Sequence, residues 1–342
     1  MRPAWISGLA LVAVLIAACG TGSTPSATTS TVSITIGLPN STPSFANSDI
    51  AVAQTEGYFG KEGLDVHVEN LSSGVSVVQG IVGGSLAIGA SSIEPVVNAV
   101  SQGAPLQVIG SYANKLTVSM VTPTSITSPA QLRGKRLGIQ QVGAFREVMT
   151  RMVIEGAGLA TSDVTYVPSS STAYTSELLQ GTIQSGVLQE EQVLKVLKKD
   201  TKLHVLVNFA TTRPDYFYGA YVVSKSWLAS HESVAEKFLT AVTEAHRFMY
   251  KNKARTVAIV AANTGYPQQT ISEAYDVLVG TEGVFGVNTG LNASVITGTI
   301  ATMKQYKILS GAEPSESSLV DTGPISAVVS KLGAWSGDPR WN

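Results

Sequence analysis

Apolar residues follow two alternating spacings along this chain, and each spacing predicts a different element. Short apolar runs rich in β-branched residues predict strands at 32–38, 64–70, 86–90 and 106–112. Between these runs the apolar residues recur at helical spacing, which predicts helices at about 48–56, 75–82 and 93–101. Strands that alternate with short helices are typical of βαβ crossovers. We therefore expect a mainly parallel sheet with helices on both faces.

The same alternation begins again near residue 117, which indicates a second α/β lobe. Its predicted elements are a β-rich stretch at 117–122, a strand at 136–140, a helix at 145–155 and a strand at 164–167. A third β-rich stretch at 218–224 precedes a mainly helical region that begins after Trp227. The chain therefore leaves one lobe, builds another and returns, and two crossing strands at 118–122 and 218–223 would form a hinge. Lobe 1 is expected at 32–120 plus 221–342, and lobe 2 at 121–220.

The N-terminal segment has a composition of its own. An apolar run at 4–18 follows the charge of Arg2 and is too short to cross a hydrocarbon core of ~30 Å comfortably, so we expect a signal peptide at 1–18. The run ends in two small residues before Cys19, the only cysteine, and this resembles the bacterial lipobox. The resemblance implies a lipid anchor on Cys19 at the outer face of the cell membrane. Residues 21–31 are Gly, Ser, Thr, Pro and Ala, so 19–31 is expected to be the lipidated cysteine and a flexible tether.

Charge and motif content exclude several classes of partner and site. The chain has 342 residues, and 23 Lys+Arg against 24 Asp+Glu give a net charge of -1, so no basic field would attract nucleic acid. No transition-metal site is expected, because the histidines lack metal-ligand spacing; they are His67, His204, His231 and His246. Phosphate-loop, dinucleotide and nucleophile-elbow motifs are missing from the sequence as well, so we expect no cofactor and no enzyme activity.

Four short motifs carry a family resemblance, and they are EGYFGKEGLDV at 56–66, QGAPL at 102–106, LRGKRLGI at 132–139 and AGL leading to DV at 157–164. Together with 303–309 and 319–321, they resemble the extracytoplasmic solute-binding proteins of ABC importers, in the group of nitrate, sulfonate, taurine and thiamine-precursor binders. The resemblance implies an α/β, two-lobed, periplasmic-binding-protein-like (type II) fold. In that fold two mainly parallel sheets flanked by helices are joined by two crossing strands.

Candidate ligand-binding residues lie in the loops after the predicted strands. In open α/β sheets, ligands bind beyond the carboxyl ends of the strands, where helix N-termini present free N–H groups. In the first lobe the candidates are Asn40, Ser41, Thr42, Ser73, Ser91 and Ser92. In the second lobe and near the return crossing they are Gly143, Ala144, Phe145, Arg146, Gln189, Glu190, Arg213, Tyr216 and Tyr218. Turn formation and helix capping explain many of these polar residues equally well.

The chemistry of these candidates leaves two classes of solute open. Arg146 and Arg213 could each bind a carboxylate or sulfonate through two parallel hydrogen bonds, and Tyr216 and Tyr218 would supply aromatic contacts. A carboxylate at Glu190 or Glu191 would repel an anion but could accept a hydrogen bond from an amine or a heterocyclic N–H. The sequence therefore predicts either a small organic anion or a planar heterocycle.

The expected function is a monomeric, lipid-anchored receptor that captures this small molecule between its lobes. It would deliver the solute to an ABC-type permease that is driven by a separate ATPase. The alternative is a surface lipoprotein that uses the same fold for sensing or scaffolding without import. A thiamine-pyrimidine-synthase-like enzyme ranks third, because some intracellular relatives of this fold use clustered cysteines, whereas Cys19 is assigned to the anchor.

Overall fold

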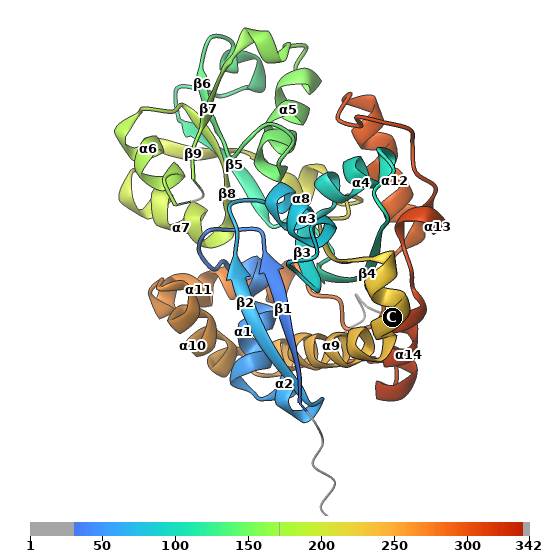
Figure 1. Cartoon of the computed structure of the whole chain (residues 1–342). Helices are drawn as coiled ribbons and strands as arrows, with labels where there is room; N and C mark the ends of the chain where they lie inside the picture. The colour runs from blue at the N-terminus through green and yellow to red at the C-terminus, as the bar shows by residue number, and fades with distance from the viewer. Residues whose placement is uncertain (1–30, 171, 338–342) are drawn as a thin grey trace, which may run out of the picture. The chain divides into compact units, whose positions relative to one another are not determined.

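Two five-stranded sheets form the framework of the computed structural model, which describes residues 31–170 and 172–337 (Figure 1). Sheet A has the order β2-β1-β3-β10-β4. Its strands are β1 (Val32–Leu38), β2 (Leu64–Asn70), β3 (Ile88–Ser92), β4 (Leu106–Ala113) and β10 (Gly219–Ser224). Sheet B has the order β7-β6-β8-β5-β9. Its strands are β5 (Val118–Pro123), β6 (Arg136–Ile139), β7 (Thr165–Pro168), β8 (Ser185–Gln189) and β9 (Leu203–Asn208). The predicted signal peptide, Cys19 and nearly all of the tether lie outside the described residues.

Both sheets are mixed: four of the five strands in each run in one direction, in line with the mainly parallel sheets that the sequence predicts, and one inner strand runs against them. In sheet A, β10 runs antiparallel to its neighbours β3 and β4, while β1 pairs in parallel with β2 and β3. In sheet B, β5 is the antiparallel strand, between β8 and β9. The two stretches predicted to cross between lobes thus form one inner strand in each sheet. Residues 114–117 and 209–218 make the connections between the sheets.

Helices cover the faces of both sheets. Between β1 and β4 the chain forms α1 (Ser48–Thr55), α2 (Tyr58–Lys61), α3 (Gly74–Val82) and α4 (Ile93–Ser101). Those of the sheet B segment are α5 (Phe145–Gly156), α6 (Tyr174–Gln180), α7 (Glu190–Lys199) and α8 (Phe209–Thr212). Short 3-10 helices occur at η1 (Phe45–Asn47), η2 (Pro129–Leu132) and η3 (Thr161–Asp163). None of the helices in 31–170 and 172–337 has the length and apolar character needed to cross a membrane.

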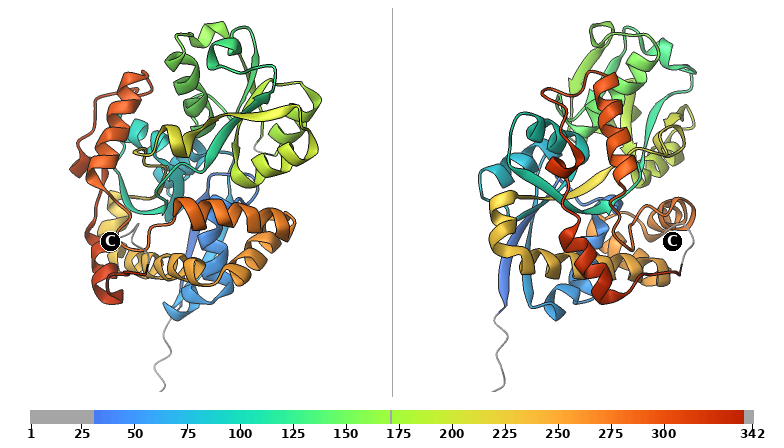
Figure 2. Two further views of the ribbon diagram at one scale, coloured as in Figure 1. Left: turned by 180° about the vertical axis from the view of Figure 1, so that it is seen from behind. Right: turned by 90° about the vertical axis from the view of Figure 1, so that its right-hand side faces the viewer.

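The chain after β10 is helical, which the sequence also predicts. Its elements are α9 (Lys225–Lys251), α10 (Lys253–Thr264), α11 (Gln268–Tyr275), the π-helical η4 (Asp276–Glu282), α12 (Ala293–Gln305), α13 (Glu316–Leu319) and α14 (Gly323–Leu332). The long helix α9 packs against α1, α2 and α14, and the views in Figure 2 place it on the side of sheet A away from sheet B. The last helices therefore complete the layer around sheet A.

Close packing explains the all-buried strand β3. Every residue of β3 is buried, which is typical of an inner strand covered on both faces. A Cβ atom at Gly89 would lie 2.6 Å from Ile81 Cδ1, so glycine is required for α3 to approach the sheet this closely. The strand also runs two residues further than the sequence predicts, and it includes Ser91 and Ser92, which pair with β10. These serines therefore lie at the end of a strand.

Candidate functional site

The loops at one end of sheet A contact those at the facing end of sheet B. Ser73 Oγ donates to Gln141 Oε1 at 3.1 Å, and Gln140 Nε2 donates to the carbonyl oxygen of Ser72 at 3.2 Å. The Phe45 backbone N–H donates to Glu191 Oε1 at 3.4 Å. Each of these hydrogen bonds joins a residue of the sheet A segment to one of the sheet B segment. The two segments are in direct contact at these loops, and we call the buried side chains at this junction the cleft.

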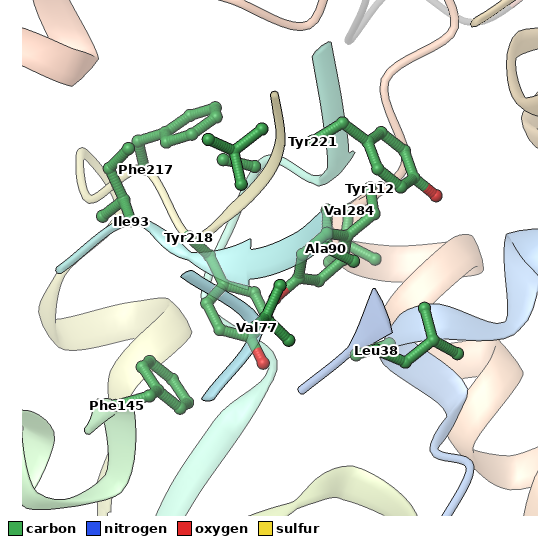
Figure 3. Packing of buried hydrophobic residues seen from close by; sticks show 14 of the residues in the cluster. Leu38, Val77, Ala90, Ile93, Tyr112, Phe145, Phe217, Tyr218, Tyr221 and Val284 are labelled. Atoms are coloured by element: carbon green, nitrogen blue, oxygen red, sulfur yellow. The ribbon is translucent and has the colours of Figure 1, made fainter. Parts of the chain in front are cut away.

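Three aromatic rings meet in the cleft. Phe145, the first residue of α5, lies 4.6 Å from Tyr218 between ring centroids, and Tyr112 on β4 meets Tyr218 edge-on at 5.6 Å (Figure 3). Gln189 Nε2 donates to the Tyr218 hydroxyl oxygen at 3.0 Å, and Thr117 Oγ1 donates to Gln189 Oε1 at 2.7 Å. The structure therefore brings together Phe145, Gln189 and Tyr218, all of which are candidates from the sequence.

A buried carboxyl group on the sheet A side lies beside these rings. Glu94, in the first turn of α4, is 0% exposed, and its Oε1 accepts a hydrogen bond from the Tyr216 hydroxyl at 2.8 Å. Its Oε2 has no partner with full hydrogen-bond geometry among the described residues, although the Ser92 hydroxyl is close enough to act on the pKa of Glu94. Burial raises the pKa of Glu94 to about 7, against smaller opposing effects of hydrogen bonds, among them that from Tyr216.

A second buried carboxyl group comes from the sheet B side. Glu191, in the first turn of α7, is 2% exposed, and its Oε1 accepts the Phe45 N–H described above. Its Oε2 likewise lacks a partner among the residues that the structure describes. Burial raises the pKa of Glu191 to about 7, while backbone hydrogen bonds and the charge of Arg146 act in the opposite direction. Each side of the cleft thus contributes one carboxyl oxygen that can accept a further hydrogen bond.

Arg146 has protein partners in this structure. It is 2% exposed, it donates through Nη1 to the carbonyl oxygen of Val187, and it donates through Nη2 to Gln192 Oε1 at 3.1 Å. Its Cζ lies 4.6 Å from the ring centroid of Tyr174. Burial lowers the pKa of Arg146. The guanidinium therefore links α5 to β8, α6 and α7, and its role toward an anionic ligand stays a prediction.

Arg213 lies at the edge of the cleft region. Its Nη2 donates to the Tyr306 hydroxyl oxygen at 2.8 Å, and its charge acts to lower the otherwise raised pKa of Tyr216. It also borders a pocket of about 410 Å³ whose walls include Met152 and Phe209. Arg213 thus faces α12 and this side pocket, and a ligand contact from it stays a prediction.

The remaining candidates take varied positions in the structure. Asn40 donates to Asn47 Oδ1 at 3.2 Å, and Ser73 accepts from the Ser76 N–H at the start of α3. Ser91 Oγ donates to the Ser92 carbonyl oxygen at 2.8 Å. The Gly143 N–H donates to Glu147 Oε2 at 3.1 Å. The other positions are exposed at Ser41 and Thr42, buried at Ser92 and Ala144, and half-buried at Glu190.

Sequence reasoning missed Glu94 and Tyr112, and it considered Glu191 only as the neighbour of the candidate Glu190. An acidic residue in the first turn of a helix complements the helix dipole whether or not it is exposed, so the position of Glu94 carries no signal of burial. Among the described residues, no group of three or more His, Cys, Asp and Glu side chains could hold a metal ion.

Comparisons with known proteins agree with this architecture. A protein-family model described as "NMT1/THI5 like" matches residues 44–256. The chain is 24% identical over 214 residues to the 4-amino-5-hydroxymethyl-2-methylpyrimidine phosphate synthase of Candida albicans (strain WO-1). The matched region covers 58% of this chain and 62% of that protein. This chain spans 60–63% of the length of the three fungal synthases that it matches.

Two solved structures illustrate the likeness in fold. The alkanesulfonate-binding protein SsuA from Xanthomonas axonopodis pv. citri, bound to MOPS, matches with a TM-score of 0.72 at 16% identity, over 86% of this chain and 99% of that chain. The periplasmic nitrate-binding protein NrtA from Synechocystis PCC 6803 matches with a TM-score of 0.69 at 12% identity, over 89% of each chain. At these identities the likeness establishes the periplasmic-binding-protein-like fold.

Proposed function

Because this chain belongs to the NMT1/THI5-like family, we propose that it is a solute-binding protein that encloses a small, N–H-donating heterocycle in the cleft. The observation that carries this proposal is the pair of buried carboxyl groups, Glu94 and Glu191, each with one oxygen that lacks a partner among the described residues. Buried polar atoms are rarely left without a hydrogen bond, because the lost hydration costs about 1–3 kcal/mol. A bound solute with N–H donors would supply the missing bonds.

The same groups favour a heterocycle over a simple anion. An anion in the cleft would meet two carboxyl groups, whereas the guanidinium of Arg146 already donates to Val187 and Gln192. The rings of Phe145 and Tyr218 offer apolar surface to a planar molecule. Of the two solute classes that the sequence leaves open, the planar heterocycle therefore fits the cleft better.

Ligand binding would be coupled to closure of the two sheet segments. A solute that contacts Glu94 on one side and Glu191 on the other gains both contacts only when the segments are together. It therefore shifts the population toward the closed form. Delivery to an ABC-type permease is supported by the shared fold with the ligand-binding component of an ABC-type import system from Staphylococcus aureus. The lipid anchor on Cys19 rests on the resemblance of the N-terminal sequence to a lipobox.

Calorimetric titration of the purified protein tests the solute class. The panel contains 4-amino-5-hydroxymethyl-2-methylpyrimidine, cytosine, MOPS and nitrate. We expect an aminopyrimidine to bind, and we expect Glu94→Gln and Glu191→Gln each to weaken its affinity by about ten-fold or more, because each change removes a charge-assisted hydrogen bond. Glu232→Gln is the matched control, because Glu232 is exposed on α9. Binding of nitrate or MOPS without any binding of a heterocycle would overturn the proposal.

A second candidate function is catalysis, which the 24% identity to the synthase of Candida albicans favours. Mass spectrometry of the bound compound after long incubation distinguishes the two functions. A receptor releases the compound unchanged, whereas an enzyme releases a product. Product that forms with the natural chain and is lost in Glu94→Gln and Glu191→Gln would place catalysis first.

A further inference from the structure

A pocket separate from the cleft lies where α5 meets the connection at 209–218. It is the side pocket of about 410 Å³ that Arg213 borders, and its walls come from η2, the C-terminal half of α5, β9 and α8. Glu94, Glu191 and Tyr218 are not among the residues that line it. Small-molecule sites have volumes of ~300–1,000 Å³ and mostly apolar walls with a few polar groups. The side pocket therefore has the size of such a site.

Most of the lining of the side pocket is apolar. Met152 of α5 and Phe209 of α8 are each 2% exposed, so they form its innermost part, and Val207 of β9 is half-buried. Pro129 and Ala130 of η2 continue the apolar wall toward the surface. Alkyl groups that cover such a surface leave water, and this favours their binding. The walls thus suit a hydrocarbon chain better than a polar molecule.

A guanidinium group lies at the rim of the side pocket. Arg213 is half-buried, and its Nη2 donates to the Tyr306 hydroxyl oxygen at 2.8 Å. Among the described residues no carboxylate forms an ion pair with Arg213, whereas Arg151 of α5 is paired with Glu147. A guanidinium group has five N–H donors, so Arg213 can donate to an anion and keep its bond to Tyr306. The rim therefore carries a positive charge that can bind an anion.

The Tyr306 hydroxyl adds a second donor beside this guanidinium. Its oxygen accepts the hydrogen bond from Arg213, and its own hydrogen has no acceptor in the part of the chain that the structure describes. The hydroxyl lies near the pocket wall, because a Cβ atom at Gly156, which lines the pocket, would lie 3.6 Å from the Tyr306 hydroxyl oxygen. N–H and O–H donors side by side are suited to the two oxygens of a carboxylate.

We propose that the side pocket binds an alkyl carboxylate of medium chain length. Its chain lies against Met152, Val207 and Phe209, and its carboxylate accepts hydrogen bonds from Arg213 and Tyr306. This site goes beyond the proposed function, because it is separate from the cleft and takes a ligand of another class. The sequence predicts that Arg213 binds an anion between the lobes, and the proposal assigns that anion to the side pocket instead.

Sodium octanoate, 1-octanol and sodium acetate separate the contributions of chain and charge. Each is titrated at low ionic strength into the full protein with ¹³C-labelled methionine methyl groups, and Met152→Leu assigns the Met152 signal. We expect octanoate to shift the signal of Met152 and to leave that of Met249 unchanged, because Met249 is buried on α9 and does not line the pocket. Octanol should bind at least about five-fold more weakly than octanoate, and acetate more weakly still.

Charge removal at the rim tests where the carboxylate binds. Arg213→Gln should weaken octanoate binding at least about five-fold and leave octanol binding unchanged. Tyr306→Phe removes the same bond between Arg213 and Tyr306 but keeps the guanidinium, so it should weaken octanoate binding by no more than about three-fold. Arg136→Gln is the control, because Arg136 is exposed at the start of β6 and does not line the pocket.

A charge placed on the opposite wall completes the test. Ala130 is exposed, so Ala130→Glu should fold normally and weaken octanoate binding at least about three-fold by repulsion, whereas the neutral Ala130→Gln should have a smaller effect. Equal affinities for octanoate and octanol, or octanoate binding that Arg213→Gln leaves unchanged, would overturn the assignment of the carboxylate to Arg213. A Met152 signal that does not shift up to about 10 mM octanoate would overturn the site itself. Both results would leave the proposed function intact, because the cleft shares none of these residues.

Discussion

Burial of two acidic side chains in one cleft has a direct thermodynamic consequence. Glu94 and Glu191 each have a pKa raised to about 7 from an ordinary value of 4.5, chiefly because the charged form loses its hydration. The folded protein therefore holds these protons more tightly than the unfolded chain does between those two pH values. Stability falls with rising pH wherever the folded state binds more protons. A shift of this size corresponds to about 3 kcal/mol for each group.

We accordingly expect these two groups to contribute most to the free energy of unfolding of the ligand-free protein below about pH 4.5. Their contribution should be lost as the pH rises through about 7. Urea denaturation at pH 5 and pH 8 measures the difference. The double variant Glu94→Gln and Glu191→Gln should flatten the profile. Part of the slope should remain, because burial also raises the pKa of the less deeply buried Glu282 to about 7. An unchanged profile in the double variant would show that neither carboxyl group is buried as described.

Ligand affinity should depend on pH in the opposite direction. An ionised carboxylate accepts a hydrogen bond from an N–H group more strongly than a protonated carboxyl group does. For a heterocycle that does not itself titrate between pH 6 and pH 8, we expect the dissociation constant to fall as the pH rises through about 7. Calorimetric titration across this range measures the effect. A dissociation constant that stays constant would place the solute away from Glu94 and Glu191.

At the scale of the elements, Arg146 holds a helix against a strand and two other helices. It donates from α5 to the carbonyl oxygen of Val187 on β8 and to Gln192 on α7, and it lies over the ring of Tyr174 on α6. Arg146→Ala should lower the free energy of unfolding by about 3 kcal/mol, because it removes a large buried side chain together with its charged hydrogen bond to the Val187 carbonyl oxygen, whereas Gln192 Oε1 keeps the hydrogen bond from the Gln189 N–H. Arg146→Lys should recover only part of that loss, since an ammonium group cannot reproduce the two diverging bonds.

Arg136 provides the matched control for this experiment. Its side chain is exposed at the start of β6, so Arg136→Ala and Arg136→Lys should each change the free energy of unfolding by less than about 0.5 kcal/mol. Urea denaturation of all four variants gives the comparison. If Arg146→Ala weakened binding of an anionic solute and left the stability of the protein unchanged, Arg146 would be a ligand-binding residue, as the sequence predicts.

Most elements could be predicted because their apolar spacing reflects burial on a sheet or helix face. The strands at 32–38 and 64–70 and the helix at 93–101 begin and end where the sequence predicts. The helix α7 was not predicted, because five of its ten residues are acidic or basic and leave few apolar positions to show a period. The strand β9 was not predicted either. Its residues are mostly half-buried at the edge of sheet B, where the apolar signal is weaker.

The candidate site could be predicted only in part, because burial of a polar side chain depends on contacts between distant segments. The loops that meet in the cleft follow from topology, and Phe145, Gln189 and Tyr218 do lie there. The sequence does not decide which of two adjacent acidic residues contributes to the site, and only Glu190 is among the final candidates, whereas the structure buries Glu191 and leaves Glu190 half-buried. The choice between them depends on how α7 rotates against η1, which no local pattern encodes.

At the scale of the whole described chain, contacts on two sides hold the sheet segments together. On one side are the hydrogen bonds of Ser73 with Gln141 and of Gln140 with Ser72. On another side, Arg213 Nη2 donates to the Tyr306 hydroxyl, and Arg151 Nη1 donates to the Lys307 carbonyl oxygen at 3.4 Å. The second pair lies at the C-terminal end of α12 and contains none of the cleft residues that we propose to touch the solute. Closure can therefore be weakened there without changing the ligand contacts.

Tyr306→Phe removes the hydroxyl that accepts from Arg213 and keeps the ring. Loss of about 1 kcal/mol from the closed form should raise the dissociation constant of the solute up to about five-fold, because only the closed form binds it fully. Small-angle X-ray scattering should then give a larger radius of gyration for the ligand-free variant and an unchanged one at saturating solute.

Tyr250→Phe is the matched control, because the Tyr250 hydroxyl donates to the Phe285 carbonyl oxygen within the sheet A segment and its C-terminal helices. That control should lower the free energy of unfolding without changing solute affinity. If Tyr306→Phe also left affinity and radius unchanged, closure would not depend on the contact between α12 and Arg213, and the rim around Ser73 and Gln141 would have to hold the two segments together alone.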